Sequence, residues 1–118
     1  MWDHNKLWAF ELGDKLAMMV YQATRNFPRE EIYGLTSQMW RAAVSVPSNI
    51  VEGCTRESHG EYLRFLEIAF GSLRELHYQY SLAKRLGYFK DNEISDFDSK
   101  FIETEKVLGS LIRSLRKT

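Results

Sequence analysis

The sequence predicts an all-α protein that folds as an antiparallel, up-down-up-down four-helix bundle in one domain spanning residues 1–118. Apolar residues recur at steps of three and four over four long stretches, which is the pattern of amphipathic helices. Two prolines and seven glycines are too few for a chain of many short strands and turns. The links between the stretches are short, and short links make consecutive helices antiparallel neighbours.

Three of the four helices have ends that the sequence marks. The first is expected over Lys6–Asn26, because a proline follows two residues later and the residue before a proline avoids the helical region. The third is expected over Ser58–Leu86, with the serine hydroxyl capping its first turn and Gly87 ending it. The fourth is expected to start at Asp91 or Asn92 and to continue to the C-terminus.

The second helix contains a proline. It is expected over Pro28–Glu52, with Gly53 as its C-terminal stop and Pro47 in its interior. An interior proline removes one backbone hydrogen bond, so the helix either breaks or bends there. We expect a kink, because the apolar spacing continues across the proline from Val46 to Ile50.

Charge and cysteine content exclude several classes of protein. Sixteen basic and sixteen acidic side chains give no net charge, so the chain has no overall excess with which to hold nucleic acid. The single cysteine, Cys54, forms no intramolecular disulfide, which suits a reducing compartment. No apolar run approaches the ~18 residues of a membrane span, and the first residues lack the pattern of a signal peptide. We therefore expect a cytoplasmic protein with no membrane contact.

The third helix has more apolar surface than a bundle requires. Phe65 and Ile68 lie outside the apolar face that continues through the rest of the helix. Aromatic residues make up 14% of the chain, and they are enriched at protein interfaces. We predict that Phe65 and Ile68 form a face for self-association. The alternative is that both are singly exposed, which is common on soluble proteins.

A continuous polar line runs along the second helix. We call it the polar stripe; it consists of Gln38, Arg41, Ser45, Asn49 and Glu52. Arg41 is expected to pair with Glu67 or Glu75 of the third helix, because a partly buried charge needs a partner. In one interpretation the stripe fixes helix register and satisfies backbone groups freed by the proline. In the other it lines a ligand pocket or the axis of an oligomer.

The side chains that carry chemistry are scattered. Cys54 and His59 are separated by the start of a capped helix, and the three histidines do not lie one helical turn apart. The paired Glu-x-x-His motifs of two-metal bundles are missing, because Glu75 precedes His77 by two residues. Isolated glycines do not form a phosphate loop. We expect neither an enzyme nor a bound metal or cofactor.

Two segments of the sequence closely resemble those of a known family, the 23S rRNA intervening-sequence proteins. The first lies within residues 27–53 and consists of Phe27-Pro28, of Glu31–Gln38, which reads EIYGLTSQ, and of Arg41–Gly53, which reads RAAVSVPSNIVEG; the second is Phe65–Leu76, which reads FLEIAFGSLREL. The resemblance covers almost the whole chain, except that Phe10 stands where the family often has a tryptophan. It implies a small cytoplasmic bacterial protein that assembles as a five-membered ring. The family name records where some of its genes lie and implies no activity.

Two functions from different classes follow. The first is a homo-oligomeric, pentameric scaffold or adaptor without chemistry of its own. The alternative is similarity to the accessory subunit of diversity-generating retroelements, a basic pentameric barrel that binds RNA or DNA and a reverse transcriptase. The neutral charge favours the first. The candidate nucleic-acid contacts of the alternative are basic residues that would cluster at one end of the bundle: Lys84, Arg85, Arg113, Arg116 and Lys117. A third hypothesis places a small ligand among Gln38, Arg41, Asn49 and Glu52.

Overall fold

The computed structural model of the chain describes residues 4–117, and these residues form helices and no strand. The elements, in chain order, are α1 (His4–Thr24), the short 3₁₀ helix η1 (Arg29–Tyr33), α2 (Leu35–Cys54), α3 (His59–Arg85) and α4 (Asp91–Arg116). The prediction of an all-α protein with four long helices is confirmed.

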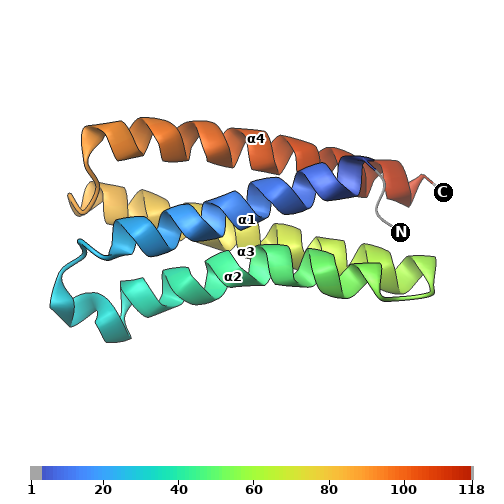
Figure 1. Cartoon of the computed structure of the whole chain (residues 1–118), viewed down its shortest axis with the longest axis horizontal. Coiled ribbons are helices and arrows are strands. Elements are labelled where there is room, and N and C mark those ends of the chain that lie inside the picture. The colour runs from blue at the N-terminus through green and yellow to red at the C-terminus, as the bar shows by residue number, and fades with distance from the viewer. Residues whose placement is uncertain (1–3, 118) are drawn as a thin grey trace.

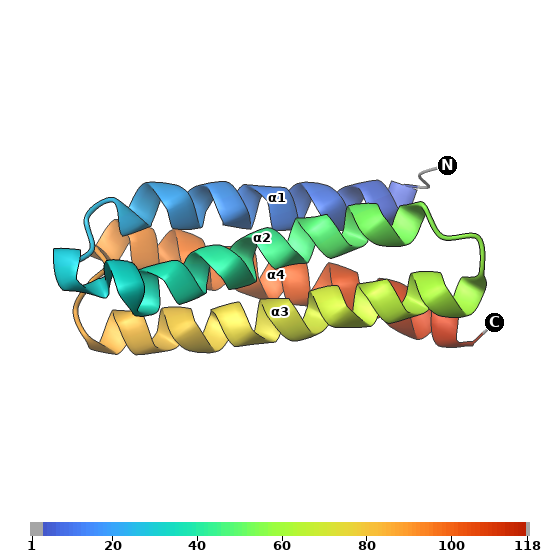
Figure 2. The same cartoon turned by 90° about the horizontal axis from the view of Figure 1, so that it is seen from below.

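The four long helices lie side by side in a body of 45 × 26 × 19 Å. The α1–α2 and α3–α4 links lie at one end of this body and the α2–α3 link at the other (Figure 1). α1 and α3 each contact both α2 and α4, so α1 and α3 are diagonal to each other (Figure 2). Each helix therefore buries two flanks and leaves an outward face.

The start of the second helix differs from the prediction. Residues 29–33 form η1, and Gly34 breaks the helix with φ −118° and ψ −116° before α2 begins at Leu35. The carboxylate of Glu31 accepts a hydrogen bond from the Leu35 amide at 3.0 Å, and so satisfies a free donor of the first turn. The hydroxyl of Tyr88 donates to the same carboxylate at 2.8 Å and ties this corner to the α3–α4 link.

The end of α2 also differs from the prediction. The helix continues through Pro47 without a break, as expected from the apolar spacing. It then continues to Cys54, so Gly53 is not its stop. Gly53 is buried, and a β-carbon there would lie 3.0 Å from Cβ of Phe65. Its role is close packing of α2 on α3 rather than helix termination.

The ends of α3 agree with the sequence. The Ser58 hydroxyl accepts a hydrogen bond from the Glu61 amide at 3.1 Å, as predicted for a cap. Gly87 adopts a left-handed conformation with φ 82°, which a residue with a β-carbon rarely adopts. Its amide bonds back to the Lys84 carbonyl, which closes the last turn of the helix.

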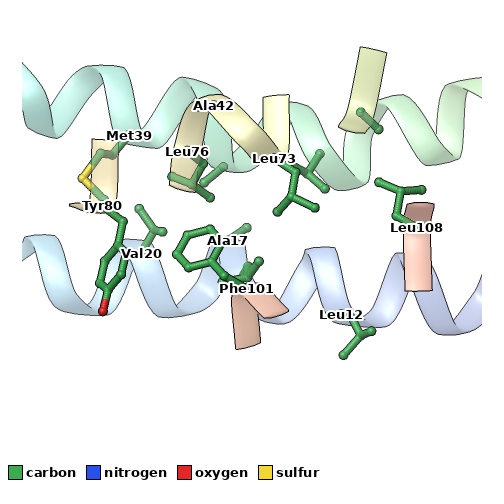
Figure 3. Close-up of a cluster of buried hydrophobic side chains, with 14 of the residues drawn as sticks. Leu12, Ala17, Val20, Met39, Ala42, Leu73, Leu76, Tyr80, Phe101 and Leu108 are labelled. Atoms are coloured by element: carbon green, nitrogen blue, oxygen red, sulfur yellow. The ribbon is translucent and has the colours of Figure 1, made fainter. Parts of the chain in front are cut away.

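The core lies between all four helices, as Figure 3 shows for one cluster of buried side chains. Towards the α3–α4 link the core is aromatic: the Tyr80 ring lies 5.1–5.2 Å from the rings of Phe89, Phe97 and Phe101. The Tyr80 hydroxyl donates to a carboxylate oxygen of Asp98 at 2.7 Å. Burial, followed by this hydrogen bond, raises the pKa of the Tyr80 hydroxyl.

We predict that Glu31→Gln lowers the melting temperature at pH 7 and that this effect shrinks in acid. Hydrogen bonds from the Leu35 amide and then from Tyr88 hold the pKa of the Glu31 carboxyl below its usual range. A carboxyl with a lowered folded-state pKa stabilises the fold above its unfolded pKa, and this contribution is lost as the pH falls through the folded pKa. The difference between the two proteins should therefore narrow below about pH 4.3.

Thermal unfolding followed by circular dichroism between pH 7 and pH 3 checks this prediction. Glu30→Gln is the matched control, because Glu30 is an exposed neighbour of the same type. A Glu31→Gln deficit as large at pH 3 as at pH 7 would contradict the assigned role.

Candidate functional site

The centre of the polar stripe joins α2 to α3. The hydroxyls of Ser45 and Ser72 lie 2.7 Å apart across the two helices. The side-chain amide of Asn49 donates to the Ser45 hydroxyl at 2.9 Å and to the Ser45 carbonyl at 2.8 Å. Pro47 lacks an amide hydrogen and so leaves the carbonyl of Ala43 without its helical hydrogen bond. The hydrogen bonds of the stripe involve Ser45 and not this carbonyl. This geometry favours the interpretation that the stripe fixes helix register.

The predicted pairing of Arg41 with Glu67 or Glu75 is wrong. Arg41 is exposed and donates to Gln38 of its own helix at 3.3 Å. Glu67 instead accepts from Arg116 of α4 at 2.7 Å, and Glu75 accepts from a glutamine one turn further along α3. Small residues bring α2 and α3 close enough for two serine hydroxyls to touch, and this leaves no room for an arginine between the helices. The last stripe residue, Glu52, pairs with Arg56 at 2.9 Å on the surface.

The two residues predicted as an oligomer face differ in exposure. Ile68 is 41% exposed on α3. Phe65 is half-buried: its β-carbon lies against Gly53, and the guanidinium of Arg56 lies 4.8 Å from the centre of its ring. Ile68 is therefore the more exposed of the two, and the assignment of this face to self-association stays a prediction.

A second outward apolar surface was not predicted. We call it the α1–α2 face; it consists of Leu7 and the half-buried Phe10 of α1 and of Val44 and Val51 of α2, with the buried Pro47 between them. Leu7, Val44 and Val51 are exposed. Every residue of the face except Leu7 borders a groove of about 440 Å³ between the two helices. The sequence signal is the seven-residue step between the valines, which places both on one side of α2.

The five basic residues proposed as nucleic-acid contacts do not form one cluster. Lys84 and Arg85 lie in the last turn of α3, whereas Arg113, Arg116 and Lys117 lie at the end of α4. These helix ends are at opposite ends of the body (Figure 1). The 27 residues of α3 correspond to about 40 Å of helix. The expectation of a single basic end is therefore wrong.

Two of these five basic residues are also neutralised by nearby acids. Lys84 lies 3.7 Å from the carboxylate of Asp98, and Arg116 forms its ion pair with Glu67. Arg113 borders a pocket of about 210 Å³ between α3 and α4, together with the ring of Phe70. Two of the five candidate contacts therefore have their charge offset by a neighbouring carboxylate.

Comparison with known proteins identifies the family of the chain. A family model described as 23S rRNA-intervening sequence protein matches residues 5–110. The chain belongs to the 23S rRNA-intervening sequence protein family. This confirms the resemblance seen in the two sequence segments. None of the curated protein sequences compared with the chain matches it.

A crystal structure supports the fold assigned to this family member. It is of a protein with unknown function from the S23 ribosomal protein family of Bacteroides thetaiotaomicron. The two chains superpose with a TM-score of 0.81 at 20% sequence identity, over 92% of this chain and 98% of the other. At this identity the likeness shows the fold alone.

Reactive side chains in this family member have structural partners. His59 lies with Nε2 2.9 Å from the carbonyl oxygen of Leu115, at the end of α4. Nδ1 of His77 lies 2.6 Å from a carboxylate oxygen of Glu105, which also pairs with Arg74 at 3.3 Å. Across residues 4–117, no three histidine, cysteine, aspartate or glutamate side chains gather where a metal ion could sit. None of the helices in that part of the chain has the length and apolar character needed to cross a membrane.

Proposed function

We propose that this family member is a non-catalytic, homo-oligomeric scaffold or adaptor that acts in the bacterial cytoplasm. In this proposal each subunit is an up-down-up-down bundle, bent at Pro47, and five copies close into a ring. The observation that carries the proposal is that apolar side chains point outward on two different sides of the bundle. One is the α1–α2 face, and the other is the surface of α3 around Ile68.

Two unlike faces suit a ring. A ring forms when one surface of each subunit binds a different surface of the next, and the rotation between copies closes. The α1–α2 face is built from α1 and α2, whereas Ile68 belongs to α3, so the two apolar surfaces are separate and one copy can present both at once. A dimer about a two-fold axis would need only one of them.

The alternative, a nucleic-acid-binding accessory protein, has less support. It needs a basic rim, and the candidate residues of that rim lie at two opposite ends of the folded body (Figure 1). The neutral total charge adds no general attraction for phosphates. The third hypothesis, a ligand among the stripe residues, loses support because the centre of the stripe is used in hydrogen bonds between α2 and α3.

We predict that Ile68→Lys dissociates the oligomer into monomers, because a charged ammonium cannot be buried in an apolar contact without a partner. Ile102→Lys is the matched control: Ile102 is 66% exposed on α4 and lies outside both proposed faces. Sedimentation velocity checks the masses of both variants, and circular dichroism checks that both remain helical. Equal masses for the two variants would overturn the assignment of Ile68 to the interface. Val51→Lys tests the α1–α2 face in the same way.

A further inference from the structure

A cavity lies at the corner where the chain passes from α1 to α2. Figure 1 shows the α1–α2 link of this corner at one end of the body. Its volume is about 500 Å³, which lies within the range of small-molecule sites. Apolar side chains of the link, of η1 and of α2 form its walls: Phe27, Pro28, Ile32 and Trp40. The polar stripe and both proposed oligomer faces contribute no residue to it.

The indole of Trp40 is held in place before any ligand binds. Its Nε1 donates to the hydroxyl of Thr24 at 2.9 Å, and that hydroxyl in turn donates to the carbonyl of Val20 at 2.8 Å. The ring of Tyr21 stacks on the indole with centres 5.4 Å apart and planes 4° from parallel. A ring fixed in this way loses little conformational freedom on binding. Trp40 is therefore a preorganised aromatic wall of the cavity.

Two arginines border the same cavity. Arg25 is the first residue of the link and Arg29 is the first residue of η1, and both are exposed. Neither forms an ion pair with a carboxylate of residues 4–117, whereas the adjacent Glu31 is engaged by Leu35 and Tyr88. Two guanidinium groups beside one cavity can hold a phosphate through parallel N–H donors.

We propose that this cavity binds a small planar ligand with a phosphate group, of the nucleoside monophosphate class. The base lies against Trp40 and Ile32, and the phosphate lies between Arg25 and Arg29. Both parts of the ligand are needed for recognition. The aromatic wall alone does not distinguish charged from neutral ligands, and the arginines alone do not distinguish ligands with a ring from ligands without one. This site does not depend on the oligomer, because it is complete within one chain.

Isothermal titration calorimetry of the full chain with adenosine monophosphate tests the proposal, with adenosine and inorganic phosphate as separate titrants. Adenosine monophosphate should bind more tightly than either part alone. The double variant Arg25→Gln/Arg29→Gln should weaken its binding by about tenfold or more, because charge-assisted hydrogen bonds are lost. Arg85→Gln, an exposed arginine on α3, is the control and should leave binding unchanged.

A Trp40→Leu variant should also weaken binding of adenosine monophosphate, and the arginine variants keep the test valid if this one unfolds. The proposal is overturned if no heat is measured up to about 5 mM ligand. It is equally overturned if the double arginine variant binds as the wild type does. Inorganic phosphate or adenosine binding as tightly as adenosine monophosphate would contradict the two-part site.

Discussion

Replacing Phe101 with alanine is expected to lower the free energy of unfolding by about 3–5 kcal/mol. The Phe101 side chain has no exposed surface. Its ring lies 4.4 Å from that of His77 and 5.2 Å from that of Tyr80. Removal of the ring leaves a cavity that α3 and α4 can close only in part, since both are long helices tied at their ends.

Urea denaturation at one fixed concentration of chain measures this loss, because the stability of an oligomer depends on concentration. Ile102→Ala is the control, since Ile102 is the next residue and is 66% exposed. It should change the free energy of unfolding by no more than about 0.5 kcal/mol. Equal losses in the two variants would mean that the aromatic cluster does not form the core at this end.

Replacing Gly13 with leucine is expected to lower the free energy of unfolding by about 1–3 kcal/mol. Gly13 is buried where α1 crosses α2. A β-carbon there would lie 3.0 Å from Cγ1 of Val46 and 3.6 Å from the backbone nitrogen of Pro47. A larger side chain must push α1 away from the proline turn of α2, and this cost exceeds the helix propensity gained by replacing glycine.

Gly71→Leu is the matched control, with the opposite expected sign. Gly71 is exposed in the interior of α3, and a β-carbon there has open space around it. Leucine in place of glycine should stabilise this helix by about 0.8 kcal/mol. Urea denaturation of both variants checks the pair. A stabilised Gly13→Leu would show that α1 and α2 do not approach closely there.

The helices could be predicted from the sequence because their signals are local. The spacing of apolar residues depends only on the helical repeat, and the caps at Ser58 and Gly87 depend on neighbouring residues. The start of α2 could not be predicted in the same way. Its capping acceptor is Glu31, which is held by a hydroxyl from Tyr88, 57 residues away.

The surface features were harder to predict, because they depend on how closely helices approach. The predicted pairing of Arg41 with an acid of α3 was wrong, because the sequence does not show that Ser45 and Ser72 contact each other directly. The prediction that the basic residues cluster was wrong because the C-terminal ends of α3 and α4 lie at opposite ends of the body. The exposure of Ile68 was expected from its angle on the helix, whereas the cover over Phe65 comes from Arg56 in the α2–α3 link.

The cavity beside Trp40 had no pattern that sequence analysis could use. Its walls come from α1, the link, η1 and α2, and its arginines lie on either side of a proline. The total charge of the chain averages Arg25 and Arg29 with its sixteen acidic side chains. Only the folded corner shows that Glu31 is used elsewhere and that the two arginines border the same space.

The mass of the wild-type chain in solution tests the central claim most directly, namely that outward-facing apolar side chains join identical copies. Sedimentation velocity over about a hundredfold range of concentration measures it. Five copies of a 13.9 kDa chain predict a species of about 70 kDa, maintained as the solution is diluted. A single species of 13.9 kDa at the highest concentration would contradict the claim.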